Sequence, residues 1–313
     1  MDRRVPLVSI GLPTYNGGRY LAQSLDALLK QDCADWELVI SDNCSTDDTE
    51  AISRDYAGRS DRIRYVRHET NLGAMANFNL TLNEATGVYF MWAADHDLWE
   101  PTFISRCVGA LEADPAAVLA YPLCRMIDES GAGIEEIGDP IDFSVPSALY
   151  RYKHLLWGNI ASKIYGLGRR EAMAAAGGFP DVQAPDRLFL VRLALQGPFE
   201  KVDDYLYIGR QNRAPETVQE RHLRTLKDLN PEQAGQRAVL PGTRLYRELR
   251  DLYMAAIDES SLSFREKLEA RVATLFVFHM RYHVASNLVR VLRVGGKVTR
   301  QTARLEHWLG KAD

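Results

Sequence analysis

Residues 90–97 read FMWAADHD, an apolar run that ends in two carboxylates on either side of an imidazole. The run predicts a buried β-strand. Asp95 and Asp97 follow it at the position where an open α/β sheet usually binds its ligand. Mg²⁺ and Mn²⁺ prefer oxygen ligands and keep substrate phosphates in their coordination shell, so one or two acids suffice for a metal held with a diphosphate. The alternative is an ordinary turn before Pro101, because Asp is common in turns.

Three apolar runs precede this strand, and stretches with helical spacing separate them. Strands are predicted at 7–12, 36–41, 62–67 and 88–93, and helices at 20–29, after Asp48, and at 74–85. This alternation is typical of βαβ units, so the sequence predicts an α/β fold with a mostly parallel, Rossmann-like sheet flanked by helices. Parallel strands end at one edge of the sheet, and functional residues should therefore cluster just after the strands.

The pattern is less regular beyond the fourth strand. Helices are predicted at 101–112, 171–176 and 188–196, strands within 117–126 and at 202–208, and an exposed loop at 131–146. Gly and Pro residues interrupt the chain again between 230 and 242, and three predicted helices follow. We therefore expect a main domain over residues 1–230 and a C-terminal helical segment over residues 231–313.

Composition restricts the class of protein. The chain has 313 residues, 46% of them hydrophobic, and a net charge of -4, which indicates no nucleic-acid partner. Its four Cys residues lack CxxC spacing and are read as reduced packing residues. No segment reaches the length of about 18 uncharged apolar residues that a membrane span needs. These features predict a cytoplasmic protein.

Positive charge gathers near the C-terminus. From Arg265 to Lys311 there are ten Lys or Arg residues against three Glu. Residues 275–294 carry one apolar face together with several Arg residues, and such a helix can lie on a membrane surface or pack on a partner helix. The sequence leaves three interpretations open: peripheral contact with the inner face of the plasma membrane, a homo-oligomer surface, and a helix packed on its own domain.

Polar residues follow each of the first four predicted strands, and their order is informative. The chain resembles the family 2 inverting glycosyltransferases of GT-A fold over residues 5–210. The resemblance rests on four segments: LPTYNGGRYLAQSLDALLKQ, ELVISDNCSTDDT, ETNLGAMANFNLTLNEATGVYFMWAADHD and GGFPDVQAPDRLFLVRLALQG. It implies transfer of a sugar from a nucleotide-diphosphate donor to a saccharide or lipid-linked hydroxyl, with Mn²⁺ or Mg²⁺ as cofactor and a role in polysaccharide biosynthesis.

The resemblance also implies which residues bind the nucleotide. Asp42 stands where the family accepts a hydrogen bond from the imide N–H of the base, which favours a UDP-sugar first and a dTDP-sugar second. Asn43 replaces a second acid. The residues implied in nucleotide binding are Pro13, Tyr15, Asn16, Asp42, Asn71, Gly73 and Asp95.

The metal motif departs from the family pattern, which has an acid, any residue, and then one or two acids. Here the order is Ala94, Asp95, His96, Asp97. If Asp97 aligns with the last acid, it is the direct metal ligand, and Asp95 contacts the ribose or a metal-bound water. For His96, metal ligation, donation to a phosphate and simple packing all stay open.

The family places an acid pair at the start of a helix near the acceptor, and this chain keeps only the second acid, as Pro185–Asp186. Inversion needs one general base, so we expect Asp186 to be that base; the alternative is a helix N-cap. Arg210 is a candidate diphosphate contact or a surface Arg. The other hypotheses are a nucleotidyltransferase, disfavoured because a Gly-rich phosphate loop is missing, and a catalytically weakened nucleotide-sugar scaffold or sensor.

Overall fold

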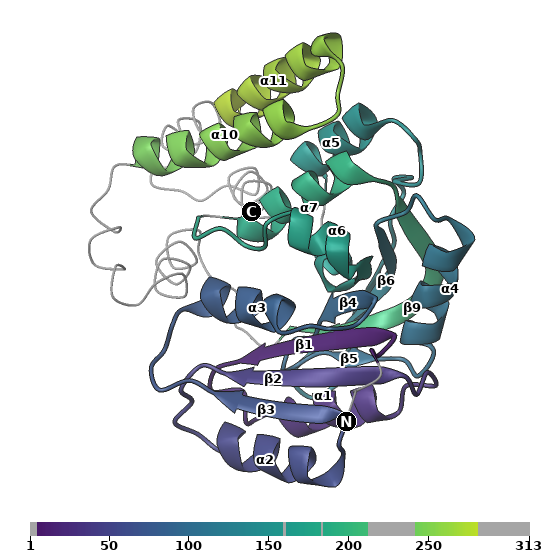
Figure 1. The fold of residues 1–313 in the computed structure, drawn as a ribbon, viewed down its shortest axis with the longest axis vertical. Coiled ribbons are helices and arrows are strands. Elements are labelled where there is room, and N and C mark those ends of the chain that lie inside the picture. Colours follow the sequence, from purple (N-terminus) through teal and green to yellow (C-terminus); the bar gives the residue numbers. More distant parts are fainter. Residues whose placement is uncertain (1–4, 159–160, 183, 212–241, 281–313) are drawn as a thin grey trace, which may run out of the picture.

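The N-terminal part alternates strands with helices, as the sequence predicts. The computed structural model describes residues 5–158, 161–182, 184–211 and 242–280. The strands of this part are β1 (Val8–Thr14), β2 (Trp36–Asp42), β3 (Ile63–Arg67) and β4 (Tyr89–Trp92). Between them lie α1 (Leu21–Leu29), α2 (Thr49–Arg59) and α3 (Ala74–Asn83). β1 pairs in parallel with β2 and with β4, and β2 pairs in parallel with β3, so all four strands end at one edge (Figure 1).

The second half of the described chain completes the sheet with short and antiparallel strands. Its elements are β5 (Leu98–Trp99), α4 (Phe103–Ala113), β6 (Leu119–Ile127), β7 (Gly133–Ile137), α5 (Ala148–Trp157), a 3-10 helix (Ala161–Tyr165), β8 (Leu167–Arg169), α6 (Arg170–Ala175), α7 (Pro185–Gln196) and β9 (Phe199–Arg210). The strand order is β3-β2-β1-β4-β8-β6-β9-β5, with β7 paired to β6. β6 and β9 are parallel, whereas β8, β5 and β7 pair antiparallel with their neighbours. The predicted α/β class is confirmed.

Two local predictions differ from the structure. The stretch 131–146, predicted as a loop, contains β7, whose residues are exposed or half-exposed. A strand with no buried side chains has no hydrophobic pattern by which the sequence could reveal it. α7 begins at Pro185, because Pro is well suited to the first turn of a helix. Asp48 is the N-cap residue of α2, but Asp47 makes the side-chain bond, accepting from the Thr49 N–H at 3.1 Å.

The strands of the sheet separate two apolar layers. Phe90 and Trp92 of β4 belong to one layer, with α7, while Tyr89 and Met91 belong to the other, with α1 and α4. Successive side chains of a strand point to opposite faces, so β4 supplies both layers. All seven residues of β1 are buried, as expected for a strand covered on both sides.

Two C-terminal helices pack on the first of these layers. They are α10 (Gly242–Glu259) and α11 (Phe264–His279), and Figure 1 shows them beside α5 and α7. Tyr253, Ile257 and Val277 belong to the same apolar cluster as Trp92. The expected boundary at 230–231 and the last of the three predicted C-terminal helices lie outside the described residues.

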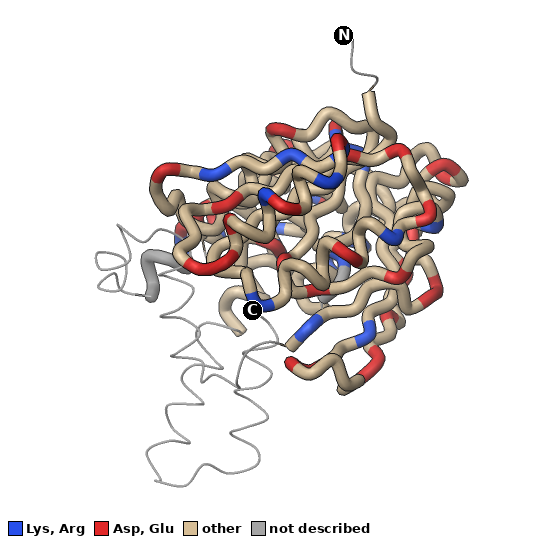
Figure 2. The backbone as a smooth tube through the Cα atoms, turned by 90° about the horizontal axis from the view of Figure 1, so that it is seen from below, with Lys and Arg blue, Asp and Glu red and all other residues tan. Residues whose placement is uncertain are grey.

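Charge and hydropathy in the described chain agree with the sequence. Figure 2 shows Lys and Arg residues interspersed with Asp and Glu residues. Among the described helices, none combines the length and the apolar composition that a bilayer crossing requires.

Candidate active site

The loops after β1, β2 and β4 meet at the carboxyl edge of the sheet. The Thr14 hydroxyl, at the end of β1, donates to Asp95 Oδ2 at 2.6 Å. Asn16 accepts from the Thr46 N–H through Oδ1 at 2.8 Å, and its own N–H donates to Ser45 Oγ at 2.9 Å. Asn16 adopts a left-handed backbone with φ of 53°, a conformation that Asn tolerates better than most residues. The structure therefore brings together the residues that the strand-end argument predicts.

Asp95 and His96 form the accessible part of the acid segment. Asp95 Oδ1 lies 2.8 Å from His96 Nδ1, and the two side chains are 17% and 26% exposed. The backbone of Gly17 lies directly against this carboxylate: a Cβ at Gly17 would be 2.2 Å from Asp95 Oδ2. The pair thus lies at the sheet edge, next to the loop that follows β1.

Asp97 is buried and bonded inside the protein. It is 3% exposed; its Oδ2 accepts from the Tyr207 hydroxyl at 2.5 Å and its Oδ1 from the Arg210 N–H at 2.8 Å. Loss of solvation raises the pKa of Asp97 above the ordinary value. Asp97 is therefore closed off from solvent, whereas Asp95 is 17% exposed, and this difference in exposure favours Asp95 over Asp97 as the metal-facing acid.

Arg210 is buried and bonded inside the protein, which corrects the reading of it as a surface Arg. It is 6% exposed, so it is not a surface Arg. Its Nε donates to the His96 carbonyl at 3.0 Å, its Nη2 donates to Gln23 Oε1 at 2.8 Å, and its guanidinium lies 4.5 Å from the ring centre of Tyr20. These contacts tie Arg210 to the acid segment and to Gln23 of α1.

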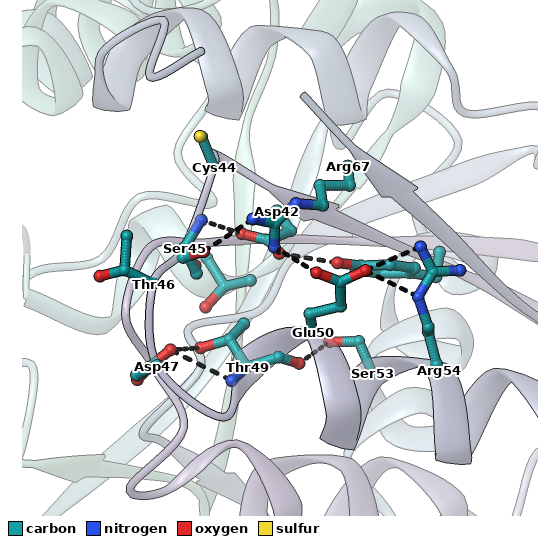
Figure 3. A network of polar contacts seen from close by, with 12 residues as sticks. Asp42, Cys44, Ser45, Thr46, Asp47, Thr49, Glu50, Ser53, Arg54 and Arg67 are labelled. Atoms are coloured by element: carbon teal, nitrogen blue, oxygen red, sulfur yellow. Dashed lines mark hydrogen bonds and ion pairs between the residues drawn. The ribbon is translucent and has the colours of Figure 1, made fainter. Parts of the chain in front are cut away.

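Asp42 is the centre of a buried network (Figure 3). It is fully buried; Oδ2 accepts from the Tyr65 hydroxyl at 2.7 Å and from Arg67 Nη1 at 3.0 Å, and Oδ1 accepts from the Ser45 N–H at 2.8 Å. Arg67 also pairs with Glu50 at 2.9 Å. Burial and the bond to Asp42 raise the pKa of Tyr65 to about 12. In this structure Asp42 fixes the loop after β2, and its carboxylate is closed off from solvent.

The loops after β2 and β3 are joined by a pair of amides. Asn43 Nδ2 donates to Asn71 Oδ1 at 2.8 Å, and the same oxygen accepts from the Gly73 N–H at 2.9 Å. Gly73 has φ of 88° and precedes α3, where a side chain would be strained. Pro13 is buried within β1, whereas Tyr15 is 50% exposed. Tyr15 is therefore the base-contact candidate whose ring is open to a ligand.

Asp186 lies in the first turn of α7 and is partly exposed. Its Oδ1 accepts from the N–H of Arg187 at 2.8 Å. Loss of solvation raises the pKa of Asp186 above the ordinary value, which makes it a stronger base than a free Asp. The N-cap alternative is wrong, because Ala184, with φ of 50°, occupies the N-cap position.

An aromatic cluster fixes the start of α7 relative to the end of β4. Trp92 stacks on Phe179 with ring centres 4.5 Å apart and meets Phe189 edge-to-face at 5.1 Å. Asn79 of α3 bonds both the N–H and the carbonyl of Phe179, at 2.7 and 2.8 Å. Phe189 lies three residues after Asp186, on the same side of the helix. The base candidate and the acid segment are thus held by one packed unit.

The donor set at Asp95 fits a divalent metal. Within the described part of the chain, no group of three or more His, Cys, Asp and Glu side chains is arranged to hold a metal ion. A metal bound together with a diphosphate needs only one or two protein ligands. One accessible carboxylate and one imidazole satisfy that need, and both are ligands that Mn²⁺ accepts.

Two residues of the site were not predicted. Thr14, which bonds Asp95, and Arg67, which holds Asp42, were both missed. Each is a polar residue at the last position of its strand, and that place in the sequence was the available signal.

Sequence comparison relates this region to a family. Residues 9–152 match the family model described as Glycosyl transferase family 2. The match covers a little under half of the chain and makes this part similar to glycosyltransferase family 2. EpsE of Bacillus subtilis, a protein named as a glycosyltransferase, is 38% identical over 108 residues, which cover 34% of this chain and 39% of EpsE. Chondroitin synthase of Escherichia coli is 31% identical over 129 residues, 41% of this chain and 19% of that protein. The chain thus matches well under half the length of these relatives.

Solved structures of other proteins resemble this chain in fold. Staphylococcus aureus TarS 1-349, in complex with UDP-GlcNAc, aligns with a TM-score of 0.66 and 19% identity over 97% of this chain and 79% of that one. The mannosyltransferase PcManGT from Pyrobaculum calidifontis, in complex with GDP-Man and Mn²⁺, aligns with a TM-score of 0.54 and 19% identity over 99% of this chain and 86% of that one. The expected GT-A fold is confirmed.

Proposed function

We propose that this chain is an inverting glycosyltransferase that moves a sugar from a nucleotide-diphosphate donor to a hydroxyl of a saccharide or lipid-linked acceptor in polysaccharide biosynthesis. The observation that carries the proposal is the packed unit at the end of β4. It holds an accessible carboxylate, Asp95, and a second carboxylate with a raised pKa, Asp186, on neighbouring elements. The family match of residues 9–152 supports it.

The proposed roles separate donor binding from acceptor activation. Asp95 and His96 would hold Mn²⁺ or Mg²⁺ with the donor diphosphate, and the bound cation would neutralise the charge of the leaving group. The Thr14 hydroxyl donates to Asp95 Oδ2 at 2.6 Å, so the carboxylate is held in place before the donor binds. Asp186 would take the proton of the acceptor hydroxyl as that oxygen attacks the anomeric carbon from the face opposite the diphosphate.

The donor base is assigned to the loops after β1 and β2. Tyr15 offers an exposed ring on which a base can stack. Asp42 is internally bonded, so recognition of a base imide would fall to backbone groups of these loops or require release of a partner of Asp42. A UDP-sugar is the first choice and a dTDP-sugar the second. The TarS complex with UDP-GlcNAc supports that order, whereas the PcManGT complex with GDP-Man makes GDP-sugars necessary competitors in the test.

A thermal-shift screen of UDP-, dTDP- and GDP-sugars, with and without Mn²⁺, tests donor binding. A ligand that binds only the folded chain raises the midpoint with concentration. We expect the largest shift for a UDP-sugar with Mn²⁺, and a reduced shift in Asp95→Asn. Equal shifts of the midpoint in wild type and in this variant would show that Asp95 does not take part in donor binding.

Release of nucleoside diphosphate in the presence of candidate acceptors then tests transfer. The alternative, a nucleotide-sugar scaffold or sensor, is favoured by the replacements at Ala94, Asn43 and Pro185. A scaffold would bind the donor and release no diphosphate, even by slow hydrolysis, whereas a transferase releases it in step with the glycosylated product.

A further inference from the structure

α11 is apolar on two opposite faces. Its inner face, with Ala270, Thr274 and Val277, is buried against the core. Its outer face exposes large apolar side chains, here called the outer stripe: Phe264 (83% exposed), Leu268 (55%), Val272 (59%), Leu275 (50%) and Phe276 (56%). An apolar helix face of this size is normally covered, as the inner face is. The outer stripe therefore needs a covering that the described residues do not supply.

The outer stripe is continuous and lies at an outer end of the molecule. Its members are spaced by three or four residues along the helix, so they share one face. Trp157 of α5, 43% exposed, extends the stripe: its ring centre is 6.1 Å from that of Phe276. Figure 1 shows α11 at the edge of the described fold, beyond α5 and α10. Exposed apolar patches of this kind mark sites of protein or membrane contact.

The charges around the stripe distinguish these two partners. The acids of α11 and its neighbours are largely paired: Glu269 bonds Lys153, and Asp258 bonds Arg271. From Val272 to Phe278 the helix has no charged residue. The chain that follows, residues 281–313, has seven Lys or Arg residues against two acids. An apolar helix face followed in sequence by basic residues is suited to the surface of a bilayer. Its apolar side chains can reach the acyl chains, and the basic residues can contact negative headgroups.

We propose that the outer stripe is a membrane-docking surface for a bilayer that carries anionic headgroups. Phe264, Leu268, Val272 and Leu275 would enter the boundary between headgroups and acyl chains, with Trp157 at the level of the headgroups. The basic residues after α11 would add attraction that weakens with salt. The inference does not depend on the proposed enzymatic function, because it rests on the exposure of α11 and on the charges around and after it.

Co-sedimentation of the full chain with vesicles tests the proposal. The vesicles are phosphatidylcholine alone and phosphatidylcholine with phosphatidylglycerol, at low and at physiological salt. We expect binding to the anionic vesicles that falls with salt, and binding at least tenfold weaker in the double variant Leu268→Glu/Val272→Glu. The matched control is Ile134→Glu, which adds a charge at another exposed apolar residue (49%) on β7 and should bind as wild type does.

Two further measurements separate the other coverings of the stripe. Trp157 fluorescence should shift to the blue on vesicle binding, and Trp157→Phe should remove most of that shift while the protein still sediments with the vesicles. Light scattering after size exclusion gives the oligomeric state. A wild-type chain that ignores anionic vesicles at low salt overturns the proposal. The proposal is also overturned if the wild-type chain is a dimer and the double variant is a monomer that binds vesicles as the wild type does. A second copy of the chain then covers the stripe.

Discussion

Gly17 packs against the carboxylate that we propose faces the donor. A methyl group at this position would lie 2.2 Å from Asp95 Oδ2 and 2.5 Å from Thr14 Oγ1, closer than any real contact. Gly17→Ala should therefore displace Asp95 and reduce the rate of transfer about 100-fold, because small misplacements of positioned groups are costly. Initial rates at saturating donor measure the effect.

The control for this variant is Gly58→Ala. Gly58 lies in α2 with no atom within 4 Å of the added methyl group. Ala favours a helix over Gly by about 1 kcal/mol, so this variant should be slightly more stable than wild type and fully active. If Gly17→Ala is also fully active, Asp95 does not need its observed position.

Asp97 should contribute to stability more than to chemistry. Asp97→Ala leaves the Tyr207 hydroxyl and the Arg210 N–H without their acceptor, and a buried unpaired group costs about 1–3 kcal/mol. Urea unfolding should report that loss, while Asp95→Asn should unfold as wild type does. A variant Asp97→Ala with unchanged stability but no Mn²⁺-dependent nucleotide binding would instead make Asp97 the direct metal ligand.

The pH dependence of turnover should report Asp186. Its pKa is raised above the ordinary Asp value of 3.8, so the folded enzyme holds this proton to higher pH than a free Asp does. The base form is the carboxylate, so turnover should rise as pH increases through the raised pKa and be lost below it. Asp186→Asn should lower turnover by about 10² to 10⁴ and leave donor binding intact. If turnover of the variant Asp186→Asn still falls at low pH in the same way, the titrating group is not Asp186.

At the scale of elements, the contact between β4 and α7 sets the distance between the two carboxylates. Phe179→Leu removes the stacking on Trp92 and should lower turnover about tenfold, with little change in donor binding. Phe143→Leu is the matched control: Phe143 is equally buried and stacks on Phe199, away from Trp92. Equal losses of turnover in the two variants would attribute the effect to stability.

The sequence predicted the long elements better than the short ones. β1 to β4 are apolar runs between helical stretches, and each was placed to within one or two residues. β5 has two residues and β8 three, too few to show a period, and β7 is exposed along its length. The strand-end rule placed Asn16 and Asp95 at the same edge of the sheet. The partners of Asp97 could not be read, because they lie more than 100 residues away.

At the scale of the whole molecule, the C-terminal helices share the core of the sheet domain. Ile257 of α10 is fully buried in the cluster that contains Trp92, so Ile257→Ala should cost about 2–5 kcal/mol. Circular dichroism and the loss of bound nucleotide should report one common transition at a lower midpoint. Two separate transitions would mean that the segment after residue 230 folds as an independent domain.

The position of β9 has a consequence for the growing chain on the ribosome. β9 pairs with β5 and supplies both partners of Asp97, so the acid segment is secured by residues synthesised more than 100 positions later. β1 to β4 can pair once the first 92 residues have emerged, since all of their pairings with one another lie within that stretch, whereas pairing over longer separations is slower. A nascent chain shorter than Arg210 would hold its strands but not its site. The catalytic edge is therefore completed only after nearly the whole sheet domain has been translated.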